Sequence, residues 1–252
     1  MKSFLIGSLP FLSKNDALKF LQKFDIPTLV TLPNIDESEF MLHHSFKDLM
    51  HFNFQRNRVH KLDSKGTALP FSFLIEDEFF QEDFSEYKWQ CTGPVSMIET
   101  MEMHEHDQLM LNDYLDKIIL TQTKFNKLTS ARPFFFVDEP MLGTSGDLRP
   151  VLLDFINKLK SHPAFKEVVF GLHCCSKIEF ELSDMPFDLF SFDYQLYSKK
   201  EWSYLQSQLK DKLVAINWDS DFNPIQYPKS NEKFQSTSCG QALCKRDLLK
   251  VV

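Results

Sequence analysis

The stretch that decides the fold is Val168-Val169-Phe170-Gly171-Leu172-His173-Cys174-Cys175, where an apolar run passes directly into a histidine and two cysteines. A continuous apolar run of this length is typical of a β-strand that is covered on both faces of a parallel sheet. Alternate side chains of an extended segment share a face, so we expect His173 and Cys175 to point one way and Cys174 the other. Imidazole and thiolate are preferred zinc ligands, whereas a buried cysteine can also serve as a small apolar side chain.

Seven other short runs along the chain resemble this strand and alternate with longer stretches of helical periodicity. They are Phe4 to Ile6, Thr28 to Thr31, Phe71 to Ile75, Trp89 to Cys91, Phe134 to Val137, Leu189 to Phe192 and Val214 to Asn217. Such alternation predicts βα units and a parallel sheet, and eight strands are the number that a closed (β/α)₈ barrel needs. The expected fold class is therefore α/β, with residues 1–252 forming a single TIM-type barrel domain.

The intervening stretches predict helices. Apolar residues recur at helical spacing over Asp107 to Lys127, Asp147 to Lys160 and Lys199 to Leu209. The second of these begins with an acidic residue and ends with two lysines, an order of charge that complements the helix dipole.

The charge and the apolar runs of the chain argue against a nucleic-acid-binding protein, a secreted protein and a membrane-spanning protein. The net charge of -7 argues against a nucleic-acid-binding protein, which usually has a basic face. Residues Met1 to Pro10 lack the features of a signal peptide, and no apolar run reaches the length of about 20 residues that a membrane span needs. We expect a cytoplasmic protein with no membrane partner. Its five cysteines are then reduced and available for metal chemistry.

Two further candidate metal ligands follow later strands. Asp193 comes directly after the run Leu189 to Phe192, and Cys239 lies beyond the eighth run. Active sites of barrels form at the carboxyl ends of the strands, with residues contributed by several of them. His173, Cys175, Asp193 and Cys239 all occupy such positions, which predicts one zinc site at the mouth of the barrel.

Carboxylates end two other strands. Asp138 and Glu139 follow the run Phe134 to Val137, where they serve either as a turn or helix-capping pair or as ligands of a substrate ammonium group. Glu76 follows the third run and is the member of its acidic segment that we expect to face a pocket.

Six motifs resemble, in their order, the catalytic barrel of cobalamin-independent methionine synthase and its short single-domain relatives. They are Gly7-Ser8-Leu9-Pro10, Thr92-Gly93-Pro94-Val95, Asp138-Glu139-Pro140, His173-Cys174-Cys175, Ser191-Phe192-Asp193-Tyr194 and Ser238-Cys239-Gly240. Together they extend over nearly the whole chain. The resemblance implies a (β/α)₈ barrel with zinc at the carboxyl ends of its strands.

The resemblance also implies roles for individual residues. Zinc ligands in the family match His173, Cys175, Asp193 and Cys239, although the full-length synthases have Glu at the position of Asp193. Family members hold the amino-acid substrate with the glycine-serine loop and the acidic motif. The predicted substrate-binding residues are Gly7, Ser8, Glu76, Thr92, Asp138 and Glu139, and the predicted catalytic residues are Asp138 and Asp193.

The predicted function is therefore a zinc-dependent methyltransferase of methionine biosynthesis that activates a thiol such as homocysteine, because zinc deprotonates a thiol that it binds. The chain lacks the N-terminal barrel of the full synthases, and the stretch Asn217 to Asp221 lacks their histidine. The methyl donor is accordingly left open between a folate, a corrinoid and a corrinoid protein. Two alternatives also stay open: an enzyme similar to uroporphyrinogen decarboxylase, and a non-catalytic zinc-binding barrel that docks onto a partner.

Overall fold

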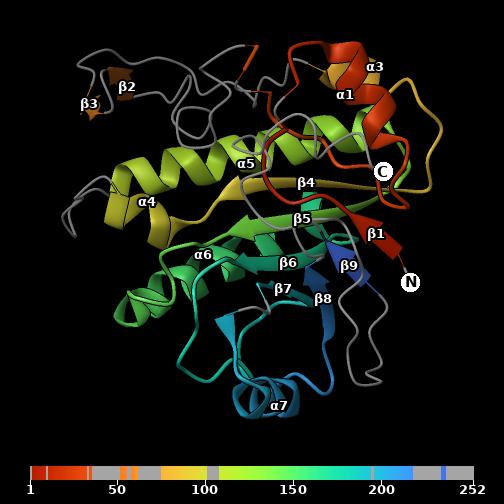
Figure 1. The fold of residues 1–252 in the computed structure, drawn as a ribbon. Helices are drawn as coiled ribbons and strands as arrows, with labels where there is room; N and C mark the ends of the chain where they lie inside the picture. The colour runs from red at the N-terminus through yellow and green to blue at the C-terminus, as the bar shows by residue number, and fades with distance from the viewer. Residues whose placement is uncertain are drawn as a thin grey trace.

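The computed structural model of the chain describes residues 2–9, 11–32, 34–35, 52–55, 58–61, 75–100, 108–193, 196–217 and 234–236. These residues form a mixed α/β fold around one curved parallel sheet, as Figure 1 shows. A separate antiparallel pair of strands, β2 (Phe52–Gln55) and β3 (Arg58–Lys61), lies apart from that sheet.

The main sheet has seven strands in the order β1-β9-β8-β7-β6-β5-β4, and every neighbouring pair is parallel. The strands are β1 (Lys2–Phe4), β4 (Glu86–Thr92), β5 (Arg132–Asp138), β6 (Val169–Cys174), β7 (Leu189–Phe192), β8 (Leu213–Asn217) and β9 (Phe234–Ser236). Because all seven run the same way, their carboxyl ends meet at one edge of the sheet.

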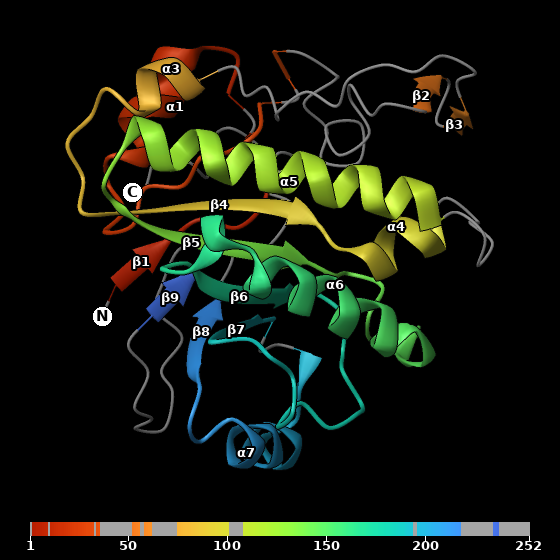
Figure 2. The ribbon, with the colours of Figure 1, turned by 180° about the vertical axis from the view of Figure 1, so that it is seen from behind.

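The helices lie on the outer side of the sheet (Figures 1 and 2). They are α1 (Lys14–Leu21), α3 (Glu76–Phe79), α4 (Pro94–Thr100), α5 (Gln108–Leu128), α6 (Arg149–Ser161) and α7 (Lys199–Gln208), with short 3₁₀ turns at Gly146–Leu148 and Pro163–Phe165. Local sequence explains where several of them begin. Ser13 caps α1, and Ser198 with Glu201 forms a capping box at the start of α7.

One extended segment, residues 26–31, links the two edge strands of the sheet. On one side the amide of Ile26 donates to the carbonyl of Ser3, next to β1. On the other side Leu29 and Pro27 exchange backbone hydrogen bonds with Lys88 of β4, at 2.7 and 2.8 Å. Residues 26–31 therefore lie between β1 and β4 and connect the first and last strands of the sheet order.

Apolar side chains pack in two separate clusters, one on each face of the sheet. The larger cluster joins the strands to the helices and includes Trp89, Phe135, Phe170 and Phe190. The smaller cluster lies on the inner face and consists of Phe4, Ile6, Ile26, Phe134, Phe136, Val169, Leu189 and Ala215, with Leu213 packed against it. A sheet that is apolar on both faces explains why its strands are continuous apolar runs in the sequence.

Comparison with the predicted elements confirms most of them. Six predicted strands correspond to β1, β4, β5, β6, β7 and β8, and the three predicted helices correspond to α5, α6 and α7, with bounds that differ by a few residues. None of the described helices is long and apolar enough to cross a membrane.

Two predicted strands are not found as ladders among the described residues, and one observed strand was not predicted. The predicted strand Thr28 to Thr31 makes a single β-bridge, between Thr28 and Lys88, rather than a ladder. The bridge joins residues 28–31 directly to β4, whereas the predicted barrel has its third strand between these two segments. The predicted third strand, Phe71 to Ile75, lies outside the described residues except for Ile75, which is in a turn. Strand β9 was not predicted, because Phe234-Gln235-Ser236 has one apolar residue.

Candidate functional site

Four polar residues form a row across the carboxyl ends of adjacent strands. Strand register pairs Thr92 with Asp138, Asp138 with His173, and His173 with Ser191. Residues paired in this way project from the same face of a sheet. All four are buried, and their face is the one that carries the smaller apolar cluster. The row is therefore a polar patch on the inner face, at the edge where the sequence predicts the site.

His173 presents one ring nitrogen that has no partner among the described residues. Its Nδ1 lies 3.2 Å from the hydroxyl of Ser191, whereas its buried Nε2 makes no hydrogen bond to the described part of the chain. When the hydroxyl of Ser191 accepts a hydrogen bond from Nδ1–H, Nε2 carries the lone pair of the neutral ring. This arrangement is that of a histidine whose second nitrogen is held by the protein while the first is free to bind a metal.

Asp138 is a buried carboxylate with both oxygens lacking a hydrogen-bond partner among the described residues. Burial raises the pKa of Asp138 to about 6, the imidazole of His173 and the ammonium of Lys88 oppose this rise, and the Cys175 thiol adds to it. An unpaired buried carboxylate is unfavourable unless a ligand satisfies it. Asp138 is thus suited to accept hydrogen bonds from a cationic group that enters the site.

Glu139 points into the protein and caps a helix. Its two carboxylate oxygens accept hydrogen bonds from the backbone amides of Val95 and Ser96, at 2.9 and 2.8 Å, and from the hydroxyl of Ser96 at 2.7 Å. The carboxylate occupies the amino end of α4, where the helix dipole favours a negative charge. Burial nevertheless raises the pKa of Glu139 to about 7. Its contacts in the structure are those of the capping alternative, and its role with substrate remains a prediction.

The other predicted substrate-binding residues do not all lie at the carboxyl ends of the strands. Gly7 and Ser8 follow β1, and Gly7 has a left-handed backbone with φ of 83°. Glu76 begins α3, is buried, and pairs with Lys124 near the end of α5. Because α5 leads back to the start of β5, this ion pair lies away from the carboxyl ends of the strands. The structure therefore does not bring Glu76 together with Asp138.

Cys174 lies on the face of the sheet that the alternation along its strand predicts. Cys174 belongs to the larger apolar cluster between sheet and helices, on the face opposite His173, and burial raises the pKa of its thiol to about 12. Cys175 is half-buried, directly after β6. Asp193 is half-buried directly after β7.

Cys239 lies outside the described residues, three positions after Ser236 ends β9. Among the residues that the structure describes, no three His, Cys, Asp or Glu side chains form a group that could hold a metal ion. The zinc site that includes Cys239 therefore stays a prediction.

Two polar residues beneath the row were missed in the sequence. Lys88 is fully buried, and its Nζ donates to the side-chain oxygen of Gln90 at 2.5 Å. Both residues alternate along β4 with Trp89 and Cys91, which face the helices. Period-two alternation between residues 87 and 92 was visible in the sequence, but such a pattern usually places the polar face in solvent.

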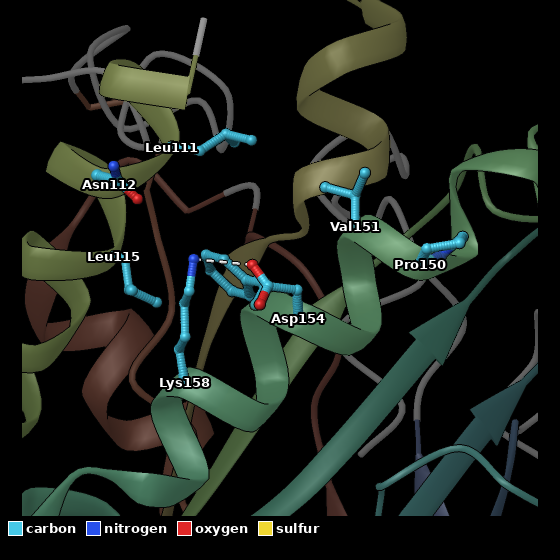
Figure 3. A pocket seen from close by; sticks show the side chains of 8 residues that line it. Leu111, Asn112, Leu115, Pro150, Val151, Asp154 and Lys158 are labelled. Atoms are coloured by element: carbon cyan, nitrogen blue, oxygen red, sulfur yellow. Dashed lines mark ion pairs between the residues drawn. The ribbon is translucent and has the colours of Figure 1, made fainter. Parts of the chain in front are cut away.

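Two surface grooves lie elsewhere on the molecule. One of about 260 Å³ runs between α5 and α6, lined by residues such as Leu111, Leu115 and Val151, with an ion pair between Asp154 and Lys158 (Figure 3). The other lies beside α7 and is lined in part by Tyr197 and Tyr204. None of the residues of the polar row lines either groove.

Comparison with known proteins finds similarity of fold. No protein-family model matches the sequence, and no curated protein matches it significantly. Among solved structures, a B12-independent methionine synthase from Shewanella sp. W3-18-1, in complex with selenomethionine, is similar with a TM-score of 0.62 and 13% sequence identity. The alignment covers 98% of this chain and 92% of that chain. The described fold is thus similar to that of a methionine synthase domain.

Proposed function

We propose that this chain is a zinc-dependent methyltransferase that activates a thiol, and that its fold is a closed (β/α)₈ barrel. The observation that carries the proposal is the buried Nε2 of His173, which has no partner among the described residues and lies in a row with the unpaired carboxylate of Asp138. One group is a metal ligand and the other an acceptor for a cation. A substrate that carries both a thiol and an ammonium group fits such a pair.

Closure of the barrel is supported by the segment 26–31. Its hydrogen bonds to Ser3 and to Lys88 connect the two edges of the seven-stranded sheet, so that this segment serves as the eighth member of the ring. In a closed ring, the carboxyl ends of β1 and β9 surround the same mouth as those of β4 to β6. Gly7, which follows β1, then borders the same mouth as His173, and Cys239 follows β9 in the sequence by three residues.

The donor chemistry of these residues fits zinc. We assign His173, Cys175 and Cys239 as ligands and Asp193 as the fourth, because imidazole, thiolate and carboxylate are the groups that zinc binds in proteins. Zinc in such a site lowers the pKa of a coordinated thiol, which keeps the sulfur nucleophilic for methyl transfer. Ser191 holds the ring of His173 through Nδ1, which leaves Nε2 for the metal.

The amino-acid end of the substrate is assigned to Asp138 with the Gly7–Ser8 loop. The carboxylate of Asp138 accepts hydrogen bonds from the ammonium group, and Thr92 lies beside Asp138 on the neighbouring strand. The similar methionine synthase is in complex with selenomethionine, which also has an amino-acid end. Homocysteine is therefore the acceptor that we propose, and the donor is a methylated folate, corrinoid or corrinoid protein.

Metal analysis of the purified full-length chain tests this proposal. We expect about one zinc per chain in the wild type and loss of zinc in Cys175→Ser and Cys239→Ser, because each change removes one thiolate ligand. Cys174→Ala is the matched control, since Cys174 is the adjacent cysteine on the opposite face and should leave the zinc content unchanged. A wild-type protein that contains no zinc after expression with added zinc would refute the metal site.

Activity is tested with the same variants. Homocysteine should be methylated by the zinc-loaded wild type with at least one of the three donor classes, and Cys174→Ala should retain this activity. Asp138→Asn should lower the affinity for homocysteine by about tenfold while keeping zinc, because the neutral amide loses the ionic contact to the ammonium group. Equal loss of zinc in Asp138→Asn would contradict the separate role assigned to Asp138.

A further inference from the structure

A side chain of β4 reaches the loop that follows β1. The backbone amide of Gly7 donates to the side-chain oxygen Oε1 of Gln90 at 3.3 Å. Strands β1 and β4 are the two edges of the seven-stranded sheet and are not hydrogen-bonded to each other. Gln90 therefore makes a contact between them that the backbone ladder does not provide.

Lys88 fixes the orientation of Gln90. Its Nζ donates to the same Oε1 and lies 4.7 Å from the centre of the Phe136 ring and 5.8 Å from that of Phe4. Two donors, one from Lys88 and one from Gly7, thus converge on a single oxygen. A fully buried lysine is rare and needs such compensation, because burial disfavours its charged form.

The backbone of Gly7 gives this contact its importance. Gly7 is buried and adopts a φ of 83°, a conformation that glycine adopts readily, and its amide donates to a side chain outside the backbone ladder. Ser8, the next residue, is half-buried. The position of this loop is therefore set from β4, two residues before Thr92 of the row.

We propose that Gln90, oriented by Lys88, is a positioning residue that holds the Gly7–Ser8 loop for recognition of the amino-acid end of a thiol substrate. The part that concerns recognition rests on the proposed function, whereas the part that concerns the loop does not. An apolar residue at this position leaves the Gly7 amide and the Lys88 ammonium without their common acceptor. Glutamate at this position keeps the acceptor.

Hydrogen exchange of the Gly7 amide tests the positioning role without any ligand. We expect Gln90→Met to speed exchange at Gly7 by about tenfold, since the amide loses its acceptor, and Gln90→Glu to restore protection. The matched control is Gln122→Met. Gln122 is a buried glutamine that accepts from Trp89 on the opposite face of β4, and its loss should not affect Gly7. Unchanged exchange in Gln90→Met overturns the proposal.

Ligand binding tests the consequence for recognition. Zinc-loaded Gln90→Met should bind homocysteine about tenfold more weakly than the wild type, yet bind 2-mercaptoethanol, which lacks the amino-acid group, equally well. Equal affinity for homocysteine in both proteins overturns the recognition role. If the wild type itself binds no homocysteine, the proposed function fails, and exchange at Gly7 still decides the positioning role. Should Gln90→Met fold poorly, Gln90→Asn, whose amide is too short to reach Gly7, replaces it.

Discussion

Gly93 lies directly against the carboxylate of Glu139. A β-carbon on Gly93 would lie 2.1 Å from the carboxyl carbon of Glu139, far inside normal contact distance. Only glycine leaves room for the carboxylate that caps α4. Glycine is therefore needed here for space, and its backbone freedom plays no part.

Gly93→Ala should destabilise the protein by about 1–3 kcal/mol, because Glu139 must move and release the amides of Val95 and Ser96. Urea unfolding measures the effect. In the background of Glu139→Ala the same substitution should have a much smaller effect, since its steric partner is gone. Additive effects in this double-mutant cycle would show that the two residues do not interact.

At the scale of elements, the start of α7 depends on a charge that lies outside the candidate site. Glu201 accepts from the Ser198 amide and from Lys177, and these contacts lower the pKa of Glu201 to about 2, with Lys177 the largest cause. A carboxylate whose pKa falls on folding stabilises the native state above its ordinary pKa. That stabilisation is lost as the pH falls toward the folded value.

Glu201→Gln should therefore lower the urea midpoint at pH 6, and its difference from the wild type should fade between pH 4.5 and about 2. Urea titrations over this pH range measure the change. Glu179→Gln is the control, because Glu179 lies 3.9 Å from the same lysine but belongs to no cap. A midpoint difference that persists unchanged at pH 2 would contradict the assigned cause.

The elements that could be predicted from sequence are those whose own composition determines them. The run at β7 was predicted with its observed bounds, since Leu189-Phe190-Ser191-Phe192 has apolar side chains on both faces of the sheet. Strand β9 is different: it exists because Phe234 and Ser236 pair with β1 and β8, and pairing over such distances leaves no local pattern. The same limit applies to Glu76, whose partner Lys124 is 48 residues away.

The candidate site was predictable to the extent that it follows the ends of strands. Asp138 and His173 were found because each ends an apolar run, and the structure places them side by side. Lys88 and Gln90 lie within a strand, and their importance depends on a contact with Gly7 across the interior. Residues of that kind can be recognised only when the strands are in place.

At the scale of the whole molecule, Thr28 contributes to the link between the two edge strands of the sheet. Its buried hydroxyl accepts from the amide of Leu5 at 3.3 Å, and its backbone bridges to Lys88. Thr28→Val keeps the shape of the side chain but leaves the Leu5 amide without an acceptor. We expect a loss of about 1–3 kcal/mol in the free energy of unfolding and faster hydrogen exchange at Leu5.

Thr123→Val serves as the control for this substitution. The hydroxyl of Thr123 donates within α5 to the carbonyl of Ile119, which keeps its helical partner, so the change should be about 0.5 kcal/mol or less. If both variants lose the same stability, the hydroxyl of Thr28 has no special part in linking the two edge strands.

Strand β1 pairs with β9, which joins residues 2–4 to residues 234–236. During synthesis the first strand therefore emerges from the ribosome long before its partner, and the sheet stays incomplete until nearly the entire described chain has been translated. Contacts so distant in sequence are slow to form, because a long loop must close before they contribute. Nascent chains shorter than residue 236 expose the edge of β1, and this protein should consequently depend on chaperones more than its modest size implies.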